Sequence, residues 1–116
     1  MASIRICDAT VTVEDTAQNN REGRPVFEWT LKLDSGREWS ESDLCGPVCG
    51  PEPSEEEMLG TFLSFLGAAI ESRLFRERTG REGDNEDLFP ADLLDWAAQH
   101  SDEISIVAIE MEEALD

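Results

Sequence analysis

Residues 44–53 divide the chain into two halves of different character. This stretch holds three prolines and two glycines, in the near repeat Cys-Gly-Pro at 45–47 and 49–51. Proline lacks a backbone N–H and clashes with the preceding helical turn, so neither a helix nor a central strand runs through it. We therefore predict a linker at 44–53 that joins a β-rich half, residues 1–43, to a helical half, residues 54–116.

The β-rich half is best defined at residues 25–33, where apolar and polar side chains alternate. Phe27, Trp29 and Leu31 point to one face, which predicts a strand with one buried side. Asp-Ser-Gly at 34–36 is typical of a short hairpin loop, so residues 37–42 are expected to return as a second strand. Residues 3–14 predict a strand with a mid-length bulge or bend, and residues 15–24 a polar loop.

The helical half opens with a clear helix signal. Ser54 with Glu57 three residues later forms a capping box, and Gly80 follows an arginine-rich last turn. Between residues 58 and 74 the helix is apolar on most sides, as expected for a helix central to a core. The alternative is a homodimer contact through the small residues Gly60, Ser64 and Gly67.

A second, shorter helix is predicted from Pro90, with Phe89, Leu93, Trp96 and Ala97 on one face. Residues 101–103 are expected to end it, and residues 104–111, rich in Ile and Val, to form a last strand inside the sheet. The predicted fold is thus a single α+β domain of order β-β-β-α-α-β, with a small mixed or antiparallel sheet covered on one face by two helices.

Charge is the second strong feature. The chain carries a formal net charge of −18, from 27 acidic and 9 basic residues. Most of it lies in residues 51–116, with net charge −14, and from Glu82 to Asp116 there are 12 carboxylates and no lysine or arginine. Eight carboxylates fall on a predicted turn, an outward helix face or a loop, and form the predicted partner-binding surface: Glu82, Asp84, Glu86, Asp87, Asp92, Asp95, Asp102 and Glu103.

No arrangement of residues matches a catalytic, metal or cofactor motif. His100 is the only histidine, and its neighbours Ser101 and Asp102 are too close in sequence to form a triad with it. A zinc site of Cys7, Cys45, Cys49 and His100 and a disulfide between Cys45 and Cys49 are alternatives to reduced thiols, which we favour. We expect no enzyme activity, no bound metal and no cofactor.

The acidic surface therefore suggests a protein-binding function. A rigid array of carboxylates can imitate the phosphates of a nucleic acid and occupy a basic groove. We predict an inhibitor of a basic nucleic-acid-binding enzyme, of the phage anti-restriction or anti-CRISPR type, that binds neither nucleic acid nor membrane. The alternatives are an assembly protein that self-associates through residues 58–74 and a salt-adapted domain of unrelated function. With no signal peptide or membrane-spanning run evident, we expect a cytoplasmic protein, in the host cytoplasm if phage-encoded.

Overall fold

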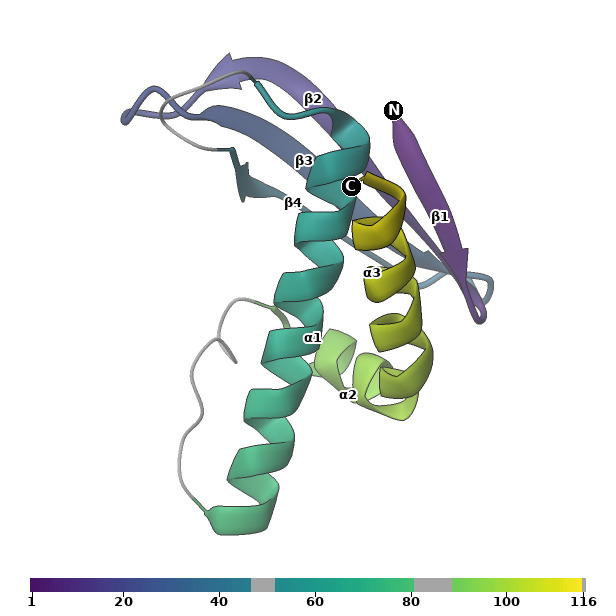
Figure 1. The fold of residues 1–116 in the computed structure, drawn as a ribbon. Coiled ribbons are helices and arrows are strands. Elements are labelled where there is room, and N and C mark those ends of the chain that lie inside the picture. Colours follow the sequence, from purple (N-terminus) through teal and green to yellow (C-terminus); the bar gives the residue numbers. More distant parts are fainter. Residues whose placement is uncertain (47–51, 81–88, 116) are drawn as a thin grey trace. The chain divides into compact units, whose positions relative to one another are not determined.

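The structure is a computed structural model that describes residues 1–46, 52–80 and 89–115, apart from the side chains of residues 112, 114 and 115. Its elements are four strands and then three helices: β1 (Ala2–Ile6), β2 (Ala9–Asn19), β3 (Pro25–Leu33), β4 (Glu38–Cys45), α1 (Glu55–Thr79), α2 (Ala91–Gln99) and α3 (Ser101–Leu115) (Figure 1). The α+β class is confirmed. The chain forms two compact units, Met1–Phe62 and Leu63–Asp116, with the division inside α1.

In the first unit, the strands pair antiparallel in chain order, β1-β2-β3-β4. The register places apolar residues in cross-strand rows: Val13 pairs with Trp29, Val11 with Leu31, and Leu31 in turn with Trp39. All of these side chains are buried. The opposite face carries polar rows, such as Ser3-Thr12-Thr30-Ser40. One buried face and one polar face explain the strict alternation of β3.

Residues 3–14 form two strands, so the prediction of one bent strand was wrong. Ile6 pairs with Ala9, and Cys7-Asp8 is the two-residue loop between β1 and β2. Cys7 has a φ of 54°, a left-handed conformation that a two-residue hairpin loop requires. Hairpin loops of this kind usually carry glycine or asparagine, and neither occurs here. The apolar side chains of residues 3–14 change faces midway along the segment. Because the usual turn residues are missing, this change suggested a bulge instead of a turn.

The irregularity lies further along, in residues predicted as a loop. The β2–β3 register shifts between Asp15 and Gln18, and Ala17 has a φ of 60°. The Asp15 Oδ1 accepts the backbone N–H of Ala17 at 2.8 Å, and the Thr16 hydroxyl donates to the Val26 carbonyl at 2.8 Å. These bonds stabilise a bulge that bends β2 and lets it continue to Asn19.

The predicted hairpin after residue 33 is confirmed. Gly36 has a φ of +103°, and the Leu33 N–H donates to the Arg37 carbonyl at 2.8 Å. The returning strand β4 continues to Cys45, three residues beyond the predicted end. Near its end, Asp43 Oδ1 accepts the indole N–H of the buried Trp29 at 2.9 Å. The largest core side chain thus has its one polar atom satisfied.

Helix α1 begins and ends as the sequence predicts. The Ser54 hydroxyl accepts the Glu57 N–H at 3.1 Å, and Gly80, at a φ of +74°, donates to the Arg76 carbonyl at 2.7 Å. Within the first unit, Phe62 of α1 packs on Trp29 of β3 with ring centroids 4.9 Å apart. Both side chains are at most 1% exposed, so the start of α1 covers the apolar face of the sheet.

By length and composition alone, α1 could also cross a membrane, which the sequence analysis did not anticipate. The core helix of a soluble protein can have the same length and composition. Met58, Leu59, Phe62, Leu63, Leu66, Ala69 and Ile70 are all buried. Core packing therefore accounts for much of the apolar content of α1.

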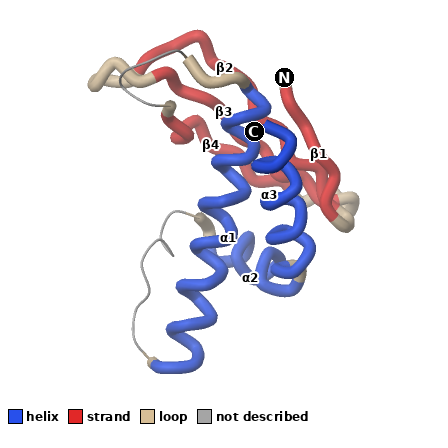
Figure 2. The backbone as a smooth tube through the Cα atoms, in the orientation of Figure 1, coloured by secondary structure: helices blue, strands red, loops and turns tan. Residues whose placement is uncertain are grey.

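Residues 104–111 are helical, so the prediction of a last strand and of the order β-β-β-α-α-β was wrong. They belong to α3 (Figure 2). Ile104 is buried, Val107, Ala108 and Met111 are half-buried, and Ile106 and Ile109 are exposed. The spacing i, i+3, i+4, i+7 is helical. The β-branched residues suggested a strand because their intrinsic preference is for strands.

We predict that Phe62→Ala lowers the free energy of unfolding by about 3–5 kcal/mol, because it removes a fully buried ring and leaves a cavity beside Trp29. Phe65→Ala, on the same helix but 46% exposed, is the matched control and should cost less than about 1 kcal/mol. Urea denaturation followed by tryptophan fluorescence measures both. Equal losses would contradict the position of Phe62 in the core.

Candidate functional site

The structure describes half of the predicted partner-binding surface. Glu82, Asp84, Glu86 and Asp87 lie outside the described residues. The other four lie in the second unit and are all exposed: Asp92, Asp95, Asp102 and Glu103. They belong to α2 and to the first turn of α3.

Helix α2 orients its two aspartates by burying its other face. It begins after Pro90, whose carbonyl accepts the Leu94 N–H at 3.1 Å. Leu93, Leu94, Trp96 and Ala97 are buried, as the sequence predicted for all but Leu94. Asp92 and Asp95 therefore point outward, three residues apart, with Cβ atoms about 5–6 Å apart on one helix face.

Asp95 is paired with an arginine of another helix, a contact that was not predicted from the sequence. Arg73 of α1 forms an ion pair with Asp95, contacts Glu77 at 3.4 Å and donates to the Ala91 carbonyl at 3.4 Å. The side-chain hydrogen bond with Asp95 raises the pKa of Arg73. Arg73 thus fastens α2 to α1 and partly neutralises Asp95. From the sequence, Arg73 was expected only as part of the arginine-rich C-terminal end of its own helix.

The start of α3 places the next two carboxylates. His100 ends α2, donates its N–H to the Ala97 carbonyl at 3.0 Å, and packs its ring against Trp96 at 4.9 Å. Asp102 and Glu103 occupy the first turn of α3, where carboxylates are stabilised by the helix dipole. His100 is thus a helix-terminal residue, as predicted, and its ring packs on an aromatic neighbour.

The zinc alternative does not fit the sheet. Cys7 lies beside the end of β3 near Leu33, whereas Cys45 pairs with Val26 at the other end of the same strand. Seven residues of strand separate them, or about 23 Å at ~3.3 Å per residue. Four ligands of one zinc ion lie about 2.0–2.3 Å from it, so Cys7 and Cys45 do not share a site. Cys49 lies outside the described residues, and within them no disulfide joins Cys7 to Cys45.

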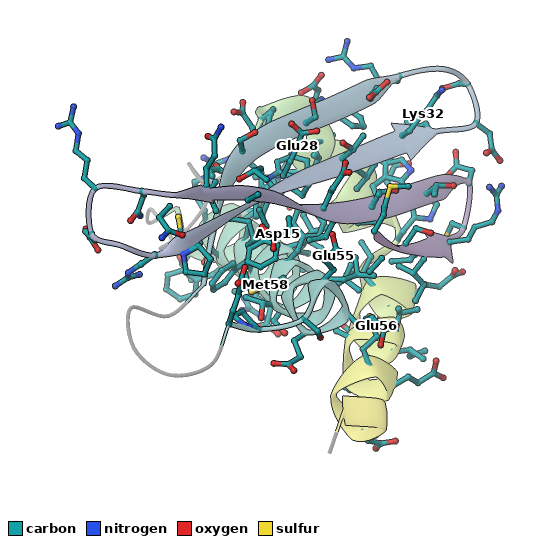
Figure 3. All side chains as sticks on the ribbon, turned by 90° about the horizontal axis from the view of Figure 1, so that it is seen from above. Asp15, Glu28, Lys32, Glu55, Glu56 and Met58 are labelled. Carbon is teal, nitrogen blue, oxygen red and sulfur yellow. The ribbon has the colours of Figure 1, made fainter. Side chains whose placement is uncertain are left out.

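A second carboxylate cluster, unpredicted from sequence, lies where the bent end of β2 meets the start of α1. Figure 3 labels Asp15 and Glu55 there, and Glu55 Oε2 accepts the Asp15 N–H at 2.8 Å. The amino group of Met1 forms an ion pair with Glu55 at 2.5 Å. These contacts lower the pKa of Glu55, whereas hydrogen bonding to the Asp15 carboxyl raises the pKa of Glu52.

The contacts of Glu55 join the start of α1 to β2 and to the amino group of Met1. Within the residues that the structure describes, no group of three or more His, Cys, Asp or Glu side chains could hold a metal ion. Its members lie far apart in sequence and meet where β2 contacts the start of α1. Nothing in the local pattern around Asp15 therefore revealed it.

Comparison with known proteins gives no relative. No family model, no curated protein and no solved structure matches this chain.

We predict that Asp15→Asn lowers the pKa of Glu52 toward its ordinary value of 4.5, because it removes the neighbouring charge while retaining an oxygen that can accept the Ala17 N–H. Because the pKa of Glu52 is raised in the folded state, the folded protein keeps the Glu52 carboxyl protonated to a higher pH than the unfolded chain does. The associated stabilisation is complete below pH 4.5 and is lost as pH rises through the higher folded-state pKa. Carboxyl NMR titration of both proteins measures the shift. An unchanged Glu52 titration would contradict the contact.

Proposed function

We propose that this chain is a small non-enzymatic protein that binds a basic partner through the carboxylates of α2 and α3, in the manner of a nucleic-acid mimic. One observation carries the proposal: Asp92, Asp95, Asp102 and Glu103 are all exposed on two consecutive helices, in a segment without lysine or arginine. A partner that binds phosphates through arginine and lysine would meet a comparable row of anions here.

Helical placement supports this proposal. Carboxylates on helices are held at fixed separations, whereas those in a flexible segment pay an ordering cost when they bind. Arg73 binds Asp95 and joins α2 to α1. We regard Asp95 chiefly as the anchor of α2, and the test therefore concerns the exposed carboxylates Asp92, Asp102 and Glu103.

The alternative of self-association through the small residues of α1 has less support. Gly60 is buried, so only Ser64 and Gly67 of the predicted strip are accessible. A net charge of −18 also opposes the association of two copies.

To test the proposal, we would combine Asp92→Asn, Asp102→Asn and Glu103→Gln in one variant. We expect wild type to capture a nucleic-acid-binding protein from lysate of its native host, added double-stranded DNA to compete, and the variant to lose most of the capture. At 0.1 M salt the Debye length is about 10 Å, so capture should also weaken steeply as salt is raised. Mass spectrometry of the captured protein provides the measurement.

The matched control combines Glu14→Gln, Glu38→Gln and Glu41→Gln, three exposed carboxylates of the sheet. Both triple variants remove three negative charges, so a general effect of net charge would reduce capture equally. Retained capture by the helix variant, or equal loss in both, would sink the proposal. Circular dichroism of both variants confirms that they fold.

A further inference from the structure

The outward face of α3 combines carboxylates with two exposed isoleucines. Ile104 is buried and the half-buried Val107 and Met111 lie on its side of the helix. At 3.6 residues per turn, Asp102, Ile106, Ile109 and Glu113 fall within about 60° of one another on the opposite side. Ile106 and Ile109 are each 55% exposed, the most of any large apolar side chain after Met1 among the described residues.

The order along this face is acid, apolar, apolar, acid. Asp102 lies at one end and Glu113 at the other, both exposed, and the exposed Glu110 flanks the isoleucines. An apolar centre within a charged rim is the usual anatomy of a protein-binding surface. A face that only had to be solvated would gain nothing from two isoleucines, which also form helices less readily than the polar residues glutamate, lysine and glutamine.

We propose that this face of α3 binds a basic amphipathic α-helix of the partner, and the proposal rests on the proposed function. Charge complementarity identifies the occupant. The carboxylates at 102, 110 and 113 require cations around the contact, and Ile106 and Ile109 require apolar side chains at its centre. A helix with an apolar stripe flanked by lysine or arginine meets both requirements at helical spacing.

Binding of an amphipathic helix differs from binding of a purely cationic groove in how the affinity depends on salt. Attraction between exposed charges is screened by salt, whereas burial of the isoleucines is not. The complex should therefore retain part of its affinity at salt concentrations that dissociate a purely electrostatic one.

The probe is a synthetic peptide of about 18 residues, made of leucine and lysine ordered as an amphipathic helix. Its control is a peptide of identical composition in scrambled order, with the same charge but no apolar face. The protein is tested as wild type, as Ile106→Ser with Ile109→Ser, and as Phe65→Ser with Leu74→Ser. The last pair removes two apolar side chains of α1 that are 46% and 43% exposed. Isothermal titration calorimetry at low and high salt gives the affinities.

We expect the ordered peptide to bind wild type at least about tenfold more tightly than the scrambled one, with the difference persisting at high salt. The Ile106/Ile109 variant should abolish that difference and leave binding of the scrambled peptide unchanged, and the Phe65/Leu74 variant should behave as wild type. Equal binding of the two peptides, or equal effects of the two variants, would overturn the docking proposal alone. Failure of both peptides to bind would overturn the cationic-partner proposal and this one with it.

Discussion

The contact between Phe62 and Trp29 is the one on which the first unit depends. An antiparallel sheet with one apolar face is not stable until that face is covered, and here two turns of α1 provide the cover. Trp29 lies in the middle of β3, pairs with Val13 on one side and Glu41 on the other, and donates its indole N–H to Asp43. Through its backbone and its side chain, this one residue therefore joins three strands and a helix.

The parts of this fold that the sequence predicted well have local causes. The hairpin after Leu33 follows from a glycine at positive φ, and the limits of α1 follow from Ser54 and Gly80, each of which makes the hydrogen bond that its position implies. No distant residue is needed to explain these features. They were accordingly recognisable from a few neighbouring residues.

The predictions that failed are of two kinds. Some depend on contacts between residues distant in sequence, and others involve residues that adopt a conformation their residue type does not favour. Cys7 adopts a left-handed conformation that its residue type does not favour, so the first hairpin was missed. In α3, Ile104, Ile106 and Ile109 favour strands by propensity, yet the burial of residues 104, 107, 108 and 111 follows a helical period. At the candidate site, exposure of the α2 aspartates was predictable from periodicity. The partner of Asp95 was not, because Arg73 lies on a different helix.

The order of the strands has a consequence for how the chain folds. Every pairing in the sheet joins strands that are neighbours in sequence, so each can close as a short hairpin with a small loop-closure cost, and assembly should be fast. During synthesis the four strands leave the ribosome before α1 does, and the side chains of Phe27, Trp29 and Leu31 are then still exposed to water. Until the first two turns of α1 follow, these side chains lack the cover that Phe62 gives Trp29 in the folded unit.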